Sequence, residues 1–126
     1  MKIKNIDHIV ITVKDIDRSI DFYTNVLGME HFISAGVQHA LRFGNQKINL
    51  HSYKGEFKPC AGNPEFGSQD LCFIVEGNLE KVKEELEQKG IDIAVCIVDR
   101  EGACGMMKSL YIYDPDGNLI ELSEYI

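Results

Sequence analysis

The chain has 126 residues, and 44% of them are hydrophobic, which suits one compact domain with a core of useful size. Its formal net charge of −7 opposes unassisted binding to nucleic acid or to an anionic membrane, because phosphate binding requires clustered Lys and Arg. No apolar run approaches the ~20 residues of a membrane-spanning helix, and residues 1–5 contain no secretory apolar segment. We therefore expect a cytoplasmic protein.

The cysteines are widely scattered and include no Cys-x-x-Cys pair. Thiolate zinc sites need such closely spaced pairs, so a site of that kind is not expected, and reduced thiols suit the predicted compartment. The four residues are Cys60, Cys72, Cys96 and Cys104.

The first half of the chain predicts a strand, a helix and three further strands. Residues 7–13 alternate as a strand, and Asp15 or Asp17 then caps a helix that Gly28 ends. The apolar stripe of this helix is Ile16, Ile20, Tyr23 and Leu27. Short strands follow at residues 29–33, 39–43 and 47–53, separated by Gly36 and by Gly44-Asn45.

The second half predicts the same order again. A strand at 70–75 leads to a helix that Asn78 caps and Gly90 ends, with Leu79, Val82 and Leu86 on one face. Strands follow at 93–98, 108–113 and 119–123, and residues 114–118 (Asp-Pro-Asp-Gly-Asn) form a turn before the last one. His8 to Gly28 spans 20 positions, as does Asp70 to Gly90. The sequence therefore contains a repeat.

The second copy is longer, because Gly28 to Asn49 spans 21 positions and Gly90 to Glu121 spans 31. The surplus falls at residues 98–106, which we expect to form a lid or binding loop.

The predicted fold is α+β, with two βαβββ modules joined into one curved eight-stranded mixed sheet with a concave cleft. Each module has one helix, which covers one face of its sheet. The other face must pack against another part of the protein. We expect a single domain over 1–126, with module one at about 5–54, a linker at about 55–68 and module two at about 69–125.

Four polar side chains occupy equivalent strand positions when the two copies are superposed. His8 matches Asp70, and Asn49 matches Glu121; all four lie opposite the apolar residues that face the helices. His51 shares that face. Imidazole with carboxylates, and no thiolate, favours a divalent Mn, Fe, Co, Ni or Zn site.

A structural interpretation of the same residues stays open. His8 then lies satisfied in the core, Asp70 caps the end of the linker, and Glu121, which is costly to bury alone, pairs with a base. The candidate bases are Arg42, Lys47 and Lys108.

Residues 7–13, 17–23, 27–29 and 114–122 resemble the first module and the last hairpin of glyoxalase I and the vicinal oxygen chelate superfamily, which also contains bleomycin resistance proteins and dioxygenases. Within it, residues 47–51 and 70–74 are similar to the branch of glyoxalase-domain-containing protein 5 and bacterial virulence proteins. The resemblance implies metal roles for His8 and Glu121. It departs at Asn49, where a carboxylate is expected, and at Asp70, where histidine is usual.

The resemblance implies a metal-dependent lyase or isomerase that acts on a small vicinally oxygenated substrate, in a homodimer. We expect His8, Asp70 and Glu121 to hold one divalent ion (Ni, Zn, Mn, Co or Fe), which acts as a Lewis acid on two vicinal oxygens. Glu121 also serves as general base, and His51 binds or deprotonates substrate. The ligand order is an inference, since His51 could replace Asp70.

Asn49, Arg100 and Tyr111 are the predicted substrate contacts. For Arg100 and Tyr111, a solvated loop charge and a core aromatic are equally good interpretations. Three other functions stay open: a ring-cleaving non-haem iron dioxygenase that uses His8, His51 and Glu121, a fosfomycin-type thiol transferase, and a metal-free protein that sequesters a small molecule or drug.

Overall fold

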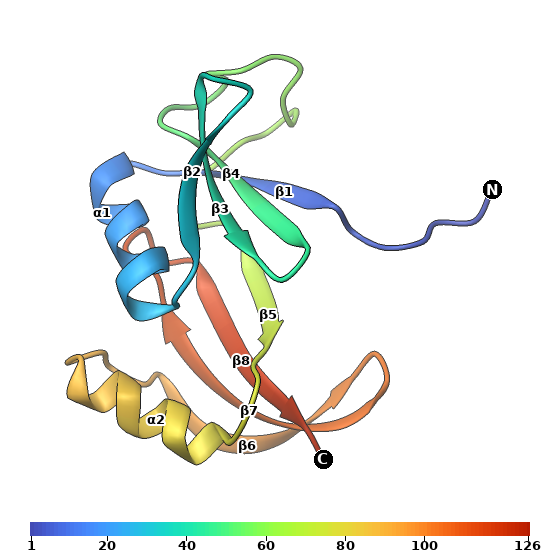
Figure 1. Cartoon of the computed structure of the whole chain (residues 1–126), viewed down its shortest axis with the longest axis vertical. Helices are drawn as coiled ribbons and strands as arrows, with labels where there is room; N and C mark the ends of the chain where they lie inside the picture. The colour runs from blue at the N-terminus through green and yellow to red at the C-terminus, as the bar shows by residue number, and fades with distance from the viewer. The chain divides into compact units, whose positions relative to one another are not determined.

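The computed structural model describes residues 1–126 and divides into two compact units, Met1–Gly67 and Ser68–Ile126. Each unit has the predicted order of strand, helical segment and three strands (Figure 1). We call the units module 1 and module 2. The predicted α+β class with two βαβββ modules is therefore confirmed, but the strands form two mixed four-stranded sheets instead of the one eight-stranded sheet expected. No helix has the length and apolarity that crossing a membrane requires.

Module 1 has the strand order β1-β4-β3-β2, in which β1 runs parallel to β4 and the other pairs are antiparallel. Its helical segment is α1 continued by one π-helical turn, η1. The elements are β1 (His8–Thr12), α1 (Ile16–Asp21), η1 (Phe22–Val26), β2 (Glu30–Ser34), β3 (Gln38–Phe43) and β4 (Gln46–His51).

Asp15, one of the two predicted caps, begins α1, because its Oδ1 accepts a hydrogen bond of 3.1 Å from the backbone N–H of Arg18. Gly28 ends the segment in the left-handed conformation, with φ of +73°. The predicted apolar stripe is only partly buried, since Ile16, Ile20 and Leu27 are half-buried. Tyr23 is buried as expected, but Phe22 and Ser19 are buried with it.

Module 2 repeats this plan with the strand order β5-β8-β7-β6. Its elements are β5 (Asp70–Ile74), α2 (Leu79–Gln88), β6 (Val95–Gly102), β7 (Gly105–Tyr113) and β8 (Leu119–Tyr125). The predicted cap is confirmed, since Asn78 Oδ1 accepts from the backbone N–H of Glu80 at 2.8 Å. The α2 helix buries Leu79 and Leu86, and Val82 stays half-buried.

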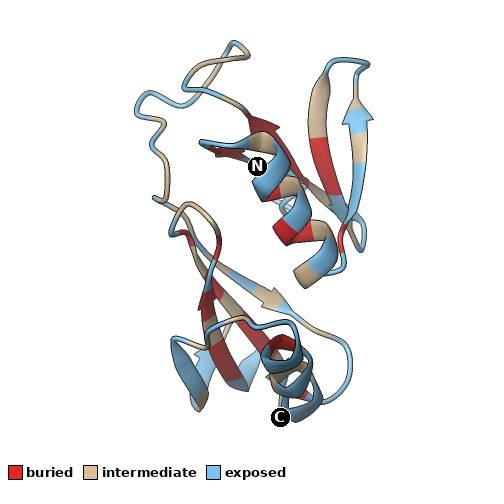
Figure 2. Ribbon diagram, turned by 90° about the vertical axis from the view of Figure 1, so that its left-hand side faces the viewer, coloured by how far each residue is buried: buried red, intermediate tan, exposed pale blue.

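Each sheet has one apolar face that forms the core of its module (Figure 2). In module 1 the register places Leu41 beside Ile48 and Ile11 beside Leu50, all of them at most 1% exposed. The corresponding buried residues of module 2 are Leu110, Ile112, Ile120 and Leu122. Since the β8 residue Glu124 accepts from the first backbone N–H of α2, the helix begins over this face. We call the opposite face of each sheet its polar face.

The turn before β8 is held by its own side chains. The carboxylate of Asp114 accepts from the backbone N–H groups of Asp116 and Asn118 and from Asn118 Nδ2, at 2.7–2.9 Å. Asn118 Oδ1 accepts from Gln69 N–H at 2.8 Å. The turn therefore fixes the start of β5 against the start of β8, in addition to reversing the chain.

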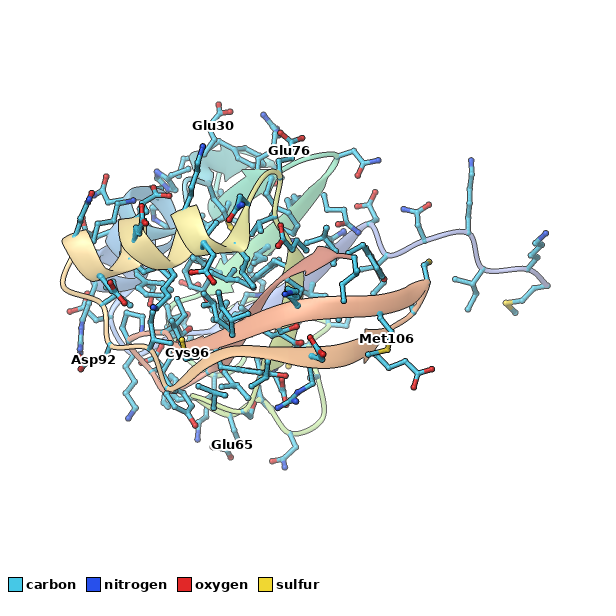
Figure 3. The ribbon with its side chains drawn as sticks, turned by 90° about the horizontal axis from the view of Figure 1, so that it is seen from below. Glu30, Glu65, Glu76, Asp92, Cys96 and Met106 are labelled. Atoms are coloured by element: carbon cyan, nitrogen blue, oxygen red, sulfur yellow. The ribbon has the colours of Figure 1, made fainter.

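The predicted loop at 98–106 is wrong. These residues belong to a hairpin in which β6 and β7 pair as far as Gly102 and Gly105, beside Met106 (Figure 3). The positive φ of +136° at Gly105 permits the tight reversal. Charged residues at 99–101 suggested a loop, but they lie on β6, the outer strand of its sheet, where charged side chains are readily solvated. The extra residues therefore lengthen two strands.

Candidate functional site

Three predicted site residues lie on the polar face of module 1. The β1–β4 register pairs Val10 with Asn49 and Thr12 with His51, and His8 lies two residues before Val10 on the same face. The prediction that His8, Asn49 and His51 share a face is confirmed. Their environments differ, because His8 is exposed whereas Asn49 and His51 are 6% and 4% exposed.

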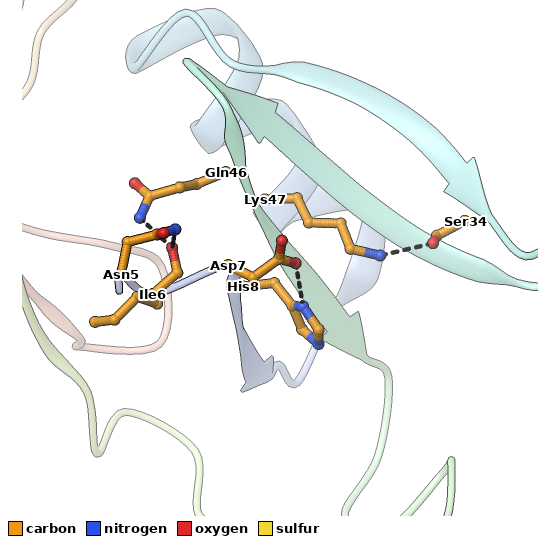
Figure 4. A network of polar contacts seen from close by, with 7 residues as sticks. All are labelled: Asn5, Ile6, Asp7, His8, Ser34, Gln46 and Lys47. Atoms are coloured by element: carbon orange, nitrogen blue, oxygen red, sulfur yellow. Dashed lines mark hydrogen bonds and ion pairs between the residues drawn. The ribbon is translucent and has the colours of Figure 1, made fainter. Parts of the chain in front are cut away.

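His8 is oriented by its neighbour. Its Nδ1 lies 2.8 Å from a carboxylate oxygen of Asp7 (Figure 4). A carboxylate on one ring nitrogen holds the ring in place and makes the other nitrogen a better metal ligand. Nε2 is that other nitrogen. Lys47, which lies beside His8 in the register, donates instead to Ser34 Oγ at 2.8 Å.

Asn49 has a buried side-chain oxygen that receives no hydrogen bond. Its Oδ1 has no hydrogen-bond partner, although the residue lies in the middle of β4 between Val10 and Ala40. Leaving such a group unpaired costs about 1–3 kcal/mol. The predicted substrate-binding role of Asn49 thus falls on an atom that needs a donor.

His51 lies at the end of β4 against the edge of the Phe57 ring, with the ring centroids 5.3 Å apart. Burial lowers the pKa of His51 below its ordinary value of 6.5, and the charge of Glu56 offsets part of this effect. For Glu56, burial raises the pKa, but hydrogen bonds from Ser52 and the charges of His51 and His39 reverse the sign and leave the pKa below 4.5. His51 is therefore held neutral close to a charged carboxylate.

The polar face of module 2 carries the other predicted site residues. The strand register pairs Glu121 with Cys72 on one side and with Tyr111 on the other. Asp70, two residues before Cys72, begins the same strand and is exposed. The prediction that Asp70 and Glu121 share a face is confirmed.

Glu121 is half-buried and is held by a hydroxyl group two residues along the strand. Its Oε1 accepts from Ser123 Oγ at 3.3 Å. Ser123 Oγ in turn lies 2.7 Å from Ser109 Oγ and 3.3 Å from Cys72 Sγ. Because the one proton of Ser123 goes to Glu121, Ser109 donates to Ser123. The result is a chain of donors that ends on the carboxylate.

Cys72 is kept in its thiol form. The residue is exposed, but partial burial of its thiol raises the pKa above 9.0; the hydrogen bond with Ser123 lowers the pKa, and the charge of Glu121 and a hydrogen bond with it raise the pKa again. The thiolate is the reactive form of cysteine, so Cys72 is a hydrogen-bond donor here and a poor nucleophile.

Arg100 and Tyr111 contact each other directly. Arg100 Nε donates to Tyr111 Oη at 2.9 Å, and the guanidinium lies over the same ring, 5.5 Å from its centroid. Arg100 is on strand β6, so its predicted loop position is wrong. Tyr111 is half-buried and shares a face with Glu121, so it is not a fully enclosed core aromatic.

The simplest structural interpretation of Glu121 does not hold in module 2. Lys108, one proposed partner, belongs to the other row of β7, where it is paired with Glu124. Neither module by itself brings together three His, Cys, Asp or Glu side chains that could hold a metal ion. The assignment of His8, Asp70 and Glu121 as ligands of one ion stays a prediction.

The sequence did not predict the hydrogen-bonded pair of Ser109 and Ser123. Ser123 follows Glu121 by two residues, and alternation alone places its hydroxyl on the same face. Ser109 is its partner across the β7–β8 ladder, which only the register reveals.

The two modules match in register as well as in sequence. In module 1 the partner of Asn49 on β1 is Val10, two residues after His8; in module 2 the partner of Glu121 on β5 is Cys72, two residues after Asp70. A family model described as the Glyoxalase/Bleomycin resistance protein/Dioxygenase superfamily matches residues 5–122. The chain belongs to this superfamily.

Within the superfamily, the chain is similar to virulence protein STM3117 of Salmonella typhimurium. The two are 49% identical over 126 residues, which cover 100% of this chain and 88% of that protein. The crystal structure of STM3117 matches this fold with a TM-score of 0.98 over 100% of both chains. Glyoxalase domain-containing protein RDO1 of Mycosarcoma maydis is 46% identical over 125 residues, 99% of this chain and 70% of that protein. The predicted branch is therefore confirmed.

A relative named as a lactoylglutathione lyase is more distant. Lactoylglutathione lyase of Schizosaccharomyces pombe is 29% identical over 150 residues, which cover 97% of this chain and 48% of that protein.

Proposed function

We propose that this protein is a metal-dependent lyase or isomerase that acts on a small substrate with two vicinal oxygens. The observation that carries the proposal is the register match between the modules. It gives His8 and Asn49 the same relation on the first sheet that Asp70 and Glu121 have on the second. Core polar residues have no physical reason to follow the repeat in this way, whereas a ligand set drawn from both modules does.

The donor chemistry fits a divalent first-row cation. His8 offers Nε2 with a carboxylate on its Nδ1. Asp70 and Glu121 offer carboxylate oxygens, and such mixed nitrogen and oxygen sets suit Mn, Fe, Co, Ni or Zn. These three residues would hold the ion, which would supply Lewis-acid polarisation of the substrate oxygens.

Glu121 is the proposed general base. Ser123 donates to Oε1, and the same carboxylate that would hold the ion would take a proton from carbon and return it. Ser123, with Ser109 donating to it from behind, would hold the carboxylate in one orientation and offset its charge before the proton arrives.

Substrate positioning is assigned to both polar faces. The unpaired Oδ1 of Asn49 would accept from a substrate hydroxyl, and neutral His51 would bind or deprotonate another. On module 2, the Arg100–Tyr111 pair presents a cation and a phenol that can hold a substrate oxygen.

A metal-free binding protein is the second candidate. Two exposed apolar residues, Val10 (41%) and Ile74 (54%), lie on the polar faces among the proposed ligands. Apolar side chains beside a few polar groups are typical of small-molecule sites. The dioxygenase and thiol-transferase alternatives have no such additional support.

Metal content and one substitution test the proposal. Protein purified without chelator should contain close to one divalent ion per chain. It should isomerise the hemithioacetal of methylglyoxal and glutathione, or a related hydroxycarbonyl compound. Glu121→Gln keeps the shape but removes the charge, so it should lose turnover and weaken metal binding while retaining the fold. The matched control is Glu101→Gln, on the exposed end of β6. If the wild type contains no metal and its melting temperature does not change when Mn, Ni or Zn is added, the result would instead support a metal-free binding protein.

A further inference from the structure

The β2–β3 hairpin of module 1 (Figure 1) brings together two of the four histidines of the chain. His31 is paired with Leu41 and His39 with Ile33, so the two imidazoles are diagonal neighbours on one face of the antiparallel pair. Their rings are stacked, with centroids 5.1 Å apart and planes inclined by 19°. His31 Nε2 lies 2.8 Å from His39 Nδ1.

The distance between these nitrogens matches two adjacent corners of a metal's coordination square. With metal–nitrogen bonds of about 2.0 Å and a right angle between them, two ligands are about 2.8 Å apart. A tetrahedral angle would separate them by roughly 3.3 Å. A hydrogen bond sets the spacing in the metal-free pair, and this spacing is close to that of two adjacent nitrogen ligands on a square-planar or octahedral ion.

The surroundings allow an ion to enter. His31 is exposed, so one side of the pair is open to water, which can fill the remaining coordination positions. His31 Nε2 and His39 Nδ1 are joined by a hydrogen bond, in which they share one proton. A bound cation would displace this proton. The carboxylate of Glu56 lies near enough to His39 to be affected by its charge, and this negative charge favours a bound cation.

We propose that His31 and His39 form a second, two-histidine metal site that prefers Cu(II) or Ni(II) to Zn(II). The site uses none of the residues assigned to the proposed lyase. It therefore stands or falls independently of that function.

Calorimetric titration of the full chain with Ni(II) tests the site, because nickel does not oxidise the four free thiols. With two imidazoles and water as its ligands, Ni(II) is octahedral and paramagnetic, so ¹H–¹⁵N spectra recorded during the titration locate the ion by line broadening. Wild type should show broadening at β2 and β3. His31→Ala and His39→Ala should each weaken that binding about tenfold or more, since one imidazole alone loses the chelate effect. Zn(II) should bind this pair more weakly than Ni(II).

His8→Ala is the matched control. His8 is also an exposed histidine with a polar partner on ring Nδ1, but it lies on β1. Its loss should leave the broadening at β2 and β3 unchanged, and it should remove any nickel bound at the proposed lyase site. If His39→Ala destabilises the fold, His31→Asn at the exposed position repeats the test. Unchanged nickel binding in the His31 variants, or broadening only outside the hairpin, would overturn the proposal.

Discussion

The polar faces of the two modules have the same register, but the central side chain is neutral in one module and charged in the other. In module 1 the central position is Asn49, a neutral side chain whose buried oxygen has no partner. In module 2 the equivalent position is Glu121, a charged side chain that is half-exposed and supported by Ser123. The same backbone position thus carries different chemistry in the two modules. One module holds an acceptor that lacks a donor, and the other holds a base with its donors in place.

The turns of the two modules provide the largest expected contrast. Asp114→Ala removes the acceptor of three hydrogen bonds at a residue that is 5% exposed. We expect a loss of about 3 kcal/mol in the free energy of unfolding, measured by urea denaturation. Asn45→Ala, in the exposed β3–β4 turn, should cost no more than about 0.5 kcal/mol. Similar losses in both variants would show that the side-chain bonds of the Asp114 turn contribute little.

The second contrast tests whether Asp70 or His51 is the third metal ligand. Asp70→Ala should weaken Mn, Ni or Zn binding by roughly 10–100-fold, comparable with other changes at metal sites, if the repeat sets the ligands. His51→Ala should leave that affinity near the wild-type value, because His51 lies two residues beyond Asn49, about 6–7 Å along the strand. Metal loss in the His51 variant with normal affinity in the Asp70 variant would exchange their roles.

The third contrast concerns Asn49. Asn49→Leu removes an unpaired buried acceptor, so it should raise the free energy of unfolding of the unliganded chain by about 1–2 kcal/mol. The same change should abolish binding of any substrate that donates to Oδ1. Glu121→Leu, the matched change in module 2, removes a carboxylate that is already bonded and should not stabilise. A less stable Asn49→Leu variant would mean that the amide contributes to folding.

The smallest expected effect is a pH dependence specific to module 1. The pKa of His51 is lowered in the folded state, so its contribution to stability is complete above pH 6.5 and is lost as the pH falls through the folded pKa. Urea midpoints at pH 7.5 and 5.5 should therefore differ more for wild type than for His51→Gln. The lowered pKa of Glu56 acts separately, below pH 4.5. Equal pH dependence in the two proteins would contradict this account.

Local signals in the sequence predicted the fold well. Asp15, Asn78 and Gly28 are caps and stops that depend only on near neighbours, and strand alternation assigned His8 and Glu121 to their faces before any register was known. The prediction of one cleft and one ligand set shared by both modules remains open, because it depends on how the modules pack together.

Two errors have a common physical cause. The β6–β7 hairpin was mistaken for a loop and the Ser109–Ser123 pair was missed, because both depend on which residues face each other across a ladder. A charged strand can be stable when one of its edges is solvated, as at Asp99 and Glu101. Composition alone cannot distinguish such a strand from a loop.

The hairpin also bears on how the chain avoids self-association while it folds. Its first half, Val95-Cys96-Ile97-Val98, is a short apolar run with high β-propensity, and it lies on an outer strand with one unpaired edge. Runs of this kind can template intermolecular β-pairing. Here the register shifts between Val95 and Val98, an irregularity that typically bends a strand, and the charges of residues 99–101 follow at once. We expect these charges to act as gatekeepers against aggregation.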